Sequence, residues 1–217
     1  MIERILPDAV VAVSTRVDVD GVDLFPEEAD AIGRAVEKRR REFATVRACT
    51  RTAYERLGLP AVAVVPGAQG EPSWSKGVVG SITHCDGYRA GALARACDVL
   101  TIGIDAERNA PLPDGLLEDI ARPEERPALR ELARAAPHVH WDRLLFSAKE
   151  SVYKAWFPLA RRWLGFEDAI VTIDRDAGAF SARLLVPGPV VAGRQLTELS
   201  GRWLVGEGLV ATSIVCV

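Results

Sequence analysis

The fold is decided by the stretch Val99-Leu100-Thr101-Ile102-Gly103-Ile104-Asp105-Ala106-Glu107. Its apolar first part predicts a buried strand, in which successive side chains point to opposite faces of the sheet. Ile102 and Ile104 then share one face, whereas Asp105 and Glu107 share the other. Two carboxylates at the end of an apolar strand indicate a site for a hard cation, because such cations prefer oxygen ligands.

A second informative stretch is Phe146-Ser147-Ala148-Lys149-Glu150-Ser151-Val152-Tyr153-Lys154. It lies in an amphipathic pattern that predicts a helix over about residues 141–156. Glu150 and Lys154 are four residues apart, so they share one face of this helix. Only four of the 27 basic residues are lysines, and two of them, Lys149 and Lys154, lie here. This placement favours a role for a compact ammonium group, the alternative being chance clustering on a solvated face.

Together the two stretches predict a metal site. Asp105, Glu107 and Glu150 would repel one another if they lay close together, and a divalent cation removes that repulsion. Mg²⁺ is favoured over Ca²⁺ because three carboxylates leave coordination positions for water and a substrate phosphate, and Mn²⁺ is an alternative metal. On spacing alone, the alternative is three unrelated surface acids among the 30 in the chain.

Composition narrows the class of protein. A chain of 217 residues with 48% hydrophobic residues can form one large domain or two small ones. Its net charge of −3 argues against a nucleic-acid-binding protein, which needs a dense basic face. No apolar run is long enough to cross a membrane, and the first residues do not resemble a signal peptide. The four cysteines are scattered, so we expect a reduced, cytoplasmic protein.

The order of the expected elements predicts an α+β fold with two α/β sub-domains, over residues 1–103 and 104–217. In both halves helical residues precede strands, and the two carboxylates fall near the junction. Residues 26–57 are expected to be helical with one break near residues 41–43, and residues 108–140 to form a connector with two short helices. Further strands are expected at residues 9–15, 78–83, 91–96, 169–174, 179–186, 203–205 and 209–215.

Three further groups of residues are candidates for binding an anionic ligand. Thr83 and His84 end an apolar strand, and both side chains can donate a hydrogen bond to a phosphate oxygen. Arg39 and Arg47 are eight residues apart and would point the same way on one helix, where guanidinium groups suit a terminal phosphate. The turn around Gly70 would let backbone groups approach a planar base. The alternatives are a structural histidine, a solvated arginine face and an ordinary turn.

Four segments, in this order, resemble motifs of the 4′-phosphopantetheinyl transferases of the larger, monomeric, surfactin- and enterobactin-type class. Gly70-Glu71-Pro72 resembles the family's Gly-x-Pro loop, and Ser81-Ile82-Thr83-His84-Cys85 resembles its Ser/Thr-His segment. Gly103-Ile104-Asp105-Ala106-Glu107 resembles its metal-binding strand. The segment at residues 146–154 resembles its W-x-x-K-E-x-x-x-K helix, which is the most specific of the four motifs.

The resemblance implies an enzyme that moves the phosphopantetheine arm of coenzyme A to a serine of an acyl or peptidyl carrier protein and releases 3′,5′-ADP. It also implies two similar halves related by a pseudo-twofold axis, with coenzyme A in the cleft between them. Asp105, Glu107 and Glu150 would hold Mg²⁺ on the pyrophosphate. The remaining contacts to coenzyme A would come from Arg39, Arg47, Gln69, Gly70, Glu71, Pro72, Thr83, His84, Lys149 and Lys154.

Three positions depart from the family pattern. Gln69 stands where the family often has Lys, so one cationic contact to the nucleotide is either missing or supplied by another arginine. Phe146 replaces the usual Trp and keeps an apolar side chain. Ala106 supplies no side-chain ligand, so we expect water at that position of the metal.

The catalytic residues expected on this basis are Glu150, Lys154 and Asp105. Glu150 would accept the proton of the carrier serine, directly or through a water on the metal. Lys154, one helical turn further along, would stabilise charge on the pyrophosphate together with the metal. Lys149 would be a second phosphate contact.

Two other functions are compatible with the same residues. One is another Mg²⁺-dependent phosphotransferase, although the chain lacks the Gly-x-x-x-x-Gly-Lys-Ser/Thr loop of ATPases and many kinases. The other is a non-catalytic regulatory protein that binds coenzyme A or a carrier, although no acid or lysine of the expected site is replaced. We expect a monomer that contacts carrier proteins transiently and binds neither nucleic acid nor a membrane.

Overall fold

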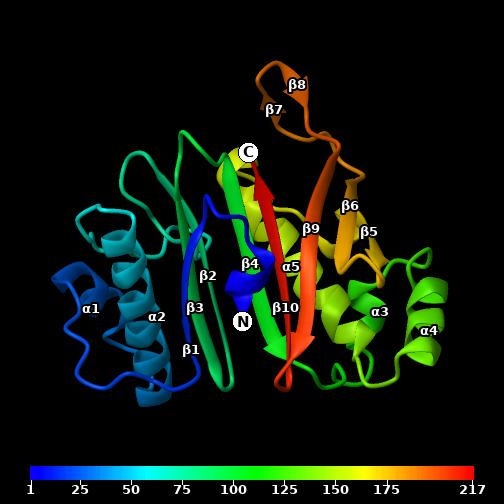
Figure 1. The fold of residues 1–217 in the computed structure, drawn as a ribbon, viewed down its shortest axis with the longest axis horizontal. Helices are drawn as coiled ribbons and strands as arrows, with labels where there is room; N and C mark the ends of the chain where they lie inside the picture. Colours follow the sequence, from blue (N-terminus) through cyan, green and yellow to red (C-terminus); the bar gives the residue numbers. More distant parts are fainter.

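The computed structural model describes residues 1–217 and has an α+β fold built on two antiparallel sheets (Figure 1). The N-terminal sheet has the strand order β1-β3-β2. Its strands are β1 (Val11–Thr15), β2 (Val78–Cys85) and β3 (Tyr88–Arg95). Helix α1 (Pro26–Ile32) precedes helix α2 (Glu37–Arg56), and α2 packs on β1 and β3.

The C-terminal sheet has the strand order β4-β10-β9-β6-β5. Helix α5 (Trp141–Ala160) packs across β4 and β10, and the connector before it contains α3 (Leu116–Ile120) and α4 (Arg126–Ala135). A small hairpin, β7 (Val190–Val191) and β8 (Arg194–Gln195), projects from the body in Figure 1. The strands of the sheet are β4 (Thr101–Arg108), β5 (Ala169–Asp174), β6 (Ala179–Leu184), β9 (Glu198–Gly206) and β10 (Leu209–Cys216).

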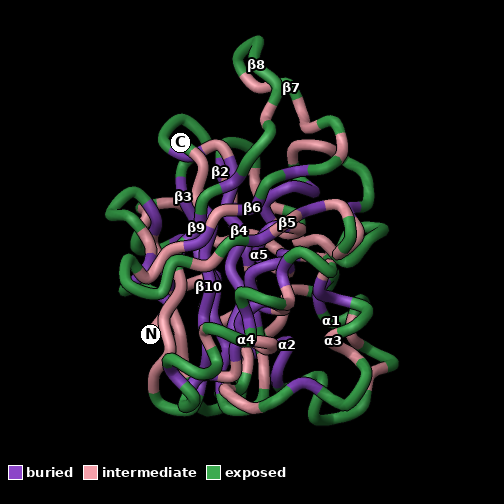
Figure 2. The backbone as a smooth tube through the Cα atoms, turned by 90° about the vertical axis from the view of Figure 1, so that its right-hand side faces the viewer, coloured by how far each residue is buried: buried purple, intermediate pink, exposed green.

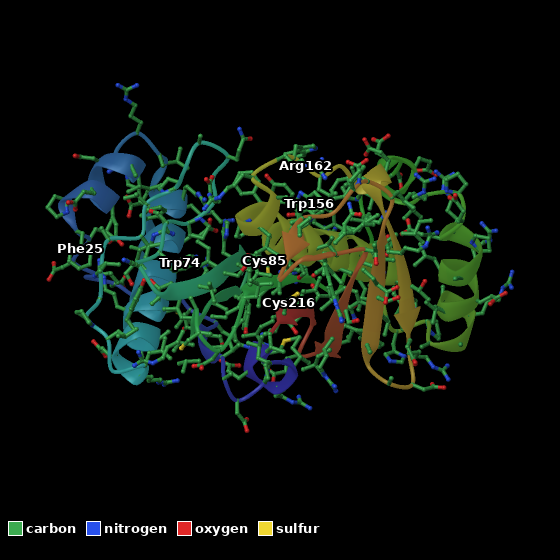
Figure 3. All side chains as sticks on the ribbon, turned by 90° about the horizontal axis from the view of Figure 1, so that it is seen from above. Phe25, Trp74, Cys85, Trp156, Arg162 and Cys216 are labelled. Atoms are coloured by element: carbon green, nitrogen blue, oxygen red, sulfur yellow. The ribbon has the colours of Figure 1, made fainter.

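The two sheets meet where β2 lies beside β4 (Figure 1). Side-chain hydroxyls, rather than a backbone ladder, join these strands. The Ile104 amide donates to the Ser81 hydroxyl at 3.0 Å, and the Ala106 amide donates to the Thr83 hydroxyl at 3.1 Å. The 3₁₀ helix η1 (Ile2–Ile5) covers the side of this junction opposite α5, as the view from above shows (Figure 3).

Strand β4 confirms the predicted alternation of faces. Ile102 and Ile104 are fully buried in a core cluster with residues of β3, β10 and η1. The opposite face of β4 lies against α5, and Gly103 allows this close approach. A methyl group at Gly103 would overlap the backbone carbonyl oxygen of Ser151. The buried residues accordingly concentrate around β4, β10 and α5 (Figure 2).

Helix α5 is held in its rotation by hydroxyl groups as well as by apolar packing. The Thr212 hydroxyl of β10 lies 3.0 Å from the Ser147 hydroxyl and 2.7 Å from the Ser151 hydroxyl. Thr212 is also the direct ladder partner of Asp105. These contacts direct the face of α5 that carries Glu150 toward the junction of the sheets.

Several boundaries differ from the sequence expectation: β3 begins earlier, β9 is longer, and α5 continues to Ala160. Two further differences concern the N-terminal helices and the division between the halves. The break in the N-terminal helical region lies at residues 33–36 and not at residues 41–43. The Arg40 side chain stabilises the earlier break because it donates hydrogen bonds to the carbonyls of Gly33 and Ala35. The expected division between residues 103 and 104 falls inside β4, so a division before Thr101 keeps this strand whole.

The structure has a three-stranded sheet in the first half and a five-stranded main sheet in the second. The pseudo-twofold relation between the halves therefore stays a prediction. None of the helices combines the length and the apolar character that a membrane crossing requires.

Candidate functional site

A cavity of about 750 Å³ lies between the two halves and is lined by both. Helix α2, the loop at residues 67–74 and strand β2 contribute from the first half, and β4 and α5 contribute from the second. Every residue expected in the site lines this cavity except Lys149. The volume falls in the range of small-molecule and cofactor sites.

Asp105 is buried at the centre of the acidic part of the cavity. One of its oxygens, Oδ1, accepts hydrogen bonds from the Thr83 hydroxyl at 3.2 Å and from the Lys154 ammonium at 2.7 Å. Its other oxygen, Oδ2, is buried and has no hydrogen-bond partner. A buried carboxylate oxygen without a partner is costly, which indicates that this atom faces a ligand.

Glu107 lies on the same face of β4 as Asp105 and pairs with an arginine of α5. The Arg143 guanidinium lies 3.3 Å from the Glu107 carboxylate and also donates to the carbonyls of Ala110 and Pro111. Burial and then the negative charge of Asp105 raise the pKa of Glu107 to about 7, although Arg143 opposes this shift.

Glu150 approaches the same cavity from α5. Burial, and to a smaller extent the charge of Asp105, raise the pKa of this carboxyl group, whereas Lys154 lowers it. Lys154 follows one helical turn later, and its ammonium donates to both Asp105 and the Ile104 carbonyl. Carboxyl groups whose pKa is raised by burial and by a neighbouring carboxylate, as at Glu107 and Glu150, are typical of functional sites.

The acids do not form a ready-made metal site in this structure. No three acidic, histidine or cysteine residues lie close enough together to act as a ligand set. Two of the expected ligands are instead neutralised internally, Asp105 by Lys154 and Glu107 by Arg143. The donor set nevertheless suits a hard cation, because all donors are carboxylates and Asp105 keeps one oxygen unpartnered.

Helix α2 contributes a cation to the same cavity. A guanidinium nitrogen of Arg39 contacts the Nε2 atom of His84, and both residues line the cavity. Burial, followed by the positive charges of Arg39 and Lys154, lowers the pKa of His84 to about 4. The imidazole is therefore neutral at neutral pH, and its Nε2 atom can accept the hydrogen bond from Arg39.

Arg47 also lines the cavity, but two of its guanidinium nitrogens already make hydrogen bonds within the protein. It donates two hydrogen bonds to the Val64 carbonyl, at 3.0 and 2.8 Å, and lies 3.5 Å from the Phe43 ring centroid. Its burial lowers its pKa to about 10. Arg47 therefore anchors the loop that follows α2, and it is a poorer candidate for a terminal phosphate than Arg39.

The loop at residues 67–72 is organised around its own acidic side chain. Gly70 has a φ of +81°, a conformation that favours glycine. The Glu71 carboxylate folds back over Gly67, where a larger side chain would overlap it, and accepts the Gln69 amide at 3.0 Å. Glu71 also lies 3.6 Å from Arg161, which follows the last turn of α5.

This geometry agrees with what comparison with known proteins finds. Residues 27–94 match the 4′-phosphopantetheinyl transferase N-terminal domain, and residues 101–206 match the 4′-phosphopantetheinyl transferase superfamily. The chain belongs to this superfamily. It is a transferase of the 4′-phosphopantetheinyl group, and the partners in this family's reaction are coenzyme A and a carrier protein.

Three curated relatives of the transferase cover most of the chain. The 4′-phosphopantetheinyl transferase Svp of Streptomyces mobaraensis is 57% identical over 217 residues, which are 99% of this chain and 88% of Svp. PptT of Mycobacterium tuberculosis is 50% identical over 91% of this chain and 88% of its own length. Npt of Nocardia iowensis is 46% identical over 99% of both chains.

The structure corrects the expected role of Lys149 in the transferase. Its ammonium lies 2.9 Å from the Glu125 carboxylate and donates to the carbonyls of Ile120, Phe166 and Ala169. Both side chains of the ion pair are almost fully buried, outside the main cavity. Lys149 therefore ties the connector and β5 to α5 and is not placed to contact a phosphate.

Thr83 is also placed differently from the expectation. Its hydroxyl accepts the Ala106 amide and donates to Asp105, and the residue is buried. This hydroxyl therefore orients the Asp105 carboxylate and joins β2 to β4, so it has no free proton for a phosphate.

Three residues of the site were missed by reasoning from the sequence: Arg143, Tyr153 and Arg161. Arg143 precedes Glu150 by two helical turns, so the helical period could have placed it near the acids. Tyr153 lines the cavity beside Lys154, and its hydroxyl is buried without a partner. Arg161 lies beyond the expected end of the helix, where no pattern pointed to it.

Proposed function

We propose that this transferase binds coenzyme A in the cavity between its two halves, with the pyrophosphate at Asp105 and Lys154 and the nucleotide toward Arg39 and His84. The observation that supports the proposal is that three carboxylates and Lys154 line one cavity together with Arg39 and His84. The carboxylates and a pyrophosphate are both negatively charged, so they can lie close together only if a cation lies between them.

Mg²⁺ is the metal we propose, held by Asp105, Glu107 and Glu150, with Mn²⁺ as a substitute. Once bound, it would neutralise the charge that develops on the pyrophosphate oxygens. The ion pairs that Asp105 and Glu107 make with Lys154 and Arg143 would then be exchanged for metal contacts. The Oδ2 atom of Asp105 has no hydrogen-bond partner, so it could bind the metal without losing a contact within the protein.

Glu150 is the proposed base for the carrier serine. Its carboxyl group lines the cavity and makes no hydrogen bond within the protein, so it is available to a substrate hydroxyl. A base works best when its pKa lies closer to the working pH, and burial shifts Glu150 in that direction. The serine oxygen would attack the phosphorus that carries the pantetheine arm, and the leaving group would be 3′,5′-ADP.

Lys154 is the proposed electrostatic partner of the leaving group. Its ammonium already lies 2.7 Å from Asp105 in the acidic part of the cavity. Release from that carboxylate when the metal binds would free its hydrogen atoms for a pyrophosphate oxygen. Glu150 and Lys154 act from one face of one helix, so both can reach the same phosphorus.

The nucleotide would lie along the first half of the chain. Arg39 and the neutral His84 would contact the 3′-phosphate side, and the loop of Gln69, Gly70, Glu71 and Pro72 would contact the adenine. We further propose a monomer that meets its acyl or peptidyl carrier partners transiently. The four free cysteines support a reducing, cytoplasmic compartment.

The test is a transfer reaction monitored by mass spectrometry. The protein is incubated with coenzyme A, Mg²⁺ and an apo carrier protein, and we expect the carrier to gain one phosphopantetheine group. Glu150→Gln should lower the rate by at least two orders of magnitude at saturating Mg²⁺, since general bases contribute about 10²–10⁴-fold. Glu131→Gln, at an exposed position of α4, is the matched control.

Two results would contradict the proposal. Near-normal turnover of Glu150→Gln would exclude this residue as both base and metal ligand. Binding of coenzyme A to the wild-type protein without any transfer to a carrier would favour the non-catalytic alternative.

A further inference from the structure

We infer that Arg161 is a further substrate-binding residue, which contacts a phosphate at the nucleotide end of coenzyme A and is held near that position in the free enzyme by Glu71. This inference rests on the proposed binding of coenzyme A in the main cavity. It concerns a residue outside all four sequence motifs.

The first argument is the state of each cation that lines the cavity. Arg39 is bound to His84, Arg47 to the Val64 carbonyl, and Lys154 to Asp105. Arg161 lines the same cavity, but its guanidinium group makes no hydrogen bond within the protein. It is therefore the cavity cation with the most hydrogen-bond donors available to a ligand.

The second argument is the position of Arg161 in the fold. It caps α5 in the left-handed conformation, with a φ of 52°, and its amide donates to the Phe157 carbonyl. This ends the helix and places the Arg161 side chain beside the loop of the other half, where it meets Glu71. A left-handed residue commonly ends a helix, and here it fixes the direction in which the Arg161 side chain leaves α5.

The third argument is the pairing itself. The Arg161 and Glu71 side chains are 3.6 Å apart, and 69% of the arginine side chain remains exposed. Exposed ion pairs of this kind contribute little to stability, so the guanidinium can leave Glu71 at small cost. A phosphate group accepts two parallel hydrogen bonds from a guanidinium, which is the stronger arrangement.

The loop that faces Arg161 also lacks a cation of its own. Between Gly67 and Trp74 the only charged side chain is that of Glu71, and Gln69 is neutral. A phosphate approaching this loop would meet a carboxylate unless a cation came from elsewhere. Arg161 is the basic residue that the structure places there.

Arg162 provides a matched control, because it is the same residue type one position later. Its guanidinium donates to the Pro187 carbonyl and stacks on the Trp156 ring at 5.0 Å, and it does not line the cavity. Figure 3 shows Arg162 beside Trp156. Both arginines are exposed, so substitution to Gln should leave the fold intact at either position.

The experiment measures binding of 3′,5′-ADP and of 4′-phosphopantetheine by calorimetry. Arg161→Gln should weaken 3′,5′-ADP binding by about tenfold, the loss of roughly one charge-assisted contact, and leave 4′-phosphopantetheine binding unchanged. Arg162→Gln should change neither. Dephospho-coenzyme A, which lacks the 3′-phosphate, then identifies the phosphate that Arg161 contacts. If Arg161→Gln and the wild type bind dephospho-coenzyme A equally well, the contact is to the 3′-phosphate. If Arg161→Gln binds it as weakly, relative to the wild type, as it binds 3′,5′-ADP, the contact is to the pyrophosphate.

Glu71→Gln supplies a second, independent readout. If Glu71 competes with the phosphate for Arg161, its neutralisation should tighten 3′,5′-ADP binding by about twofold to fivefold in the wild type. The same change made in the Arg161→Gln protein should have no such effect. Glu71 also accepts the Gln69 amide, so the two backgrounds are compared: a merely structural ion pair would make Glu71→Gln weaken binding more in the wild type than in the Arg161→Gln protein.

Failure of the inference is distinguishable from failure of the proposed function. If the wild-type protein does not bind 3′,5′-ADP, the placement of coenzyme A in this cavity is wrong. If it binds 3′,5′-ADP and Arg161→Gln binds it equally well, or if only 4′-phosphopantetheine binding is lost, the assignment of Arg161 is overturned.

Discussion

Replacement of Lys149 by Met distinguishes the buried ion pair from the phosphate contact that the motif suggested. The Lys149 and Glu125 side chains are 2% and 1% exposed. Burial also lowers the pKa of Lys149, against the influence of Glu125. Methionine is one atom shorter than lysine, remains unbranched and apolar, and removes the charge and the donors.

The loss of stability in Lys149→Met depends on which contacts the Glu125 carboxylate would keep. Its carboxylate would retain hydrogen bonds from the amides of Arg122, at 2.8 Å, and Val171, at 2.6 Å, but would lose its counter-charge. Removal of one partner of a buried ion pair costs about 3–5 kcal/mol. For a chain of this size each kcal/mol corresponds to about 2–4 °C, so the melting temperature should fall by roughly 10 °C.

The assay is urea unfolding followed by tryptophan fluorescence, with thermal unfolding alongside. Lys38→Met, at an exposed position of α2, is the matched control and should change stability by less than about 0.5 kcal/mol. The double variant Lys149→Met with Glu125→Gln removes both charges and should recover part of the loss. A Lys149→Met protein that melted normally but had lost its affinity for coenzyme A would refute the reasoning and restore the phosphate contact.

Three further predictions concern the junction, His84 and the metal. Gly103→Ala should prevent α5 from lying on β4 and sharply lower the free energy of unfolding, whereas Gly206→Ala, in open space, should not. An NMR titration should give His84 a pKa near 4, below its ordinary value of 6.5, so stability should fall as the pH drops from 6.5 toward 4. Saturation with 3′,5′-ADP should raise that pKa, because bound phosphate adds negative charge. A chelator should abolish transfer, and added Mg²⁺ or Mn²⁺ should restore it; transfer that persisted in the chelator would exclude the metal.

The parts of the fold that were predictable are those set by local periodicity. The alternation along β4 requires only the geometry of a strand, and the shared face of Glu150 and Lys154 requires only the helical repeat. Both hold in the structure, where Ile102 and Ile104 face the core and Asp105 lies in the cavity.

The parts that were missed depend on contacts between segments far apart in the chain. Lys149 matches a lysine of the family's helix motif, but its environment is set by Glu125 in the connector. Arg47 points toward the cavity as the helical spacing predicts, but the Val64 carbonyl engages it. In both residues a distant partner decides whether the charge is available, and a pattern of residue types does not contain that information.

The same consideration explains why the site lies at the junction of the sheets. The Thr83 hydroxyl accepts the Ala106 amide and thereby joins β2 to β4, and it gives its proton to Asp105. One group therefore both holds the halves together and orients a carboxylate of the site. Because α5 is fixed to β10 through Thr212, the ladder partner of Asp105, Glu150 and Asp105 are held in one half, and a shift between the halves would move Thr83 of β2 relative to both. The contacts that pack the junction thus also set the geometry of the proposed chemistry. A variant that loosens the junction should therefore impair the transfer reaction.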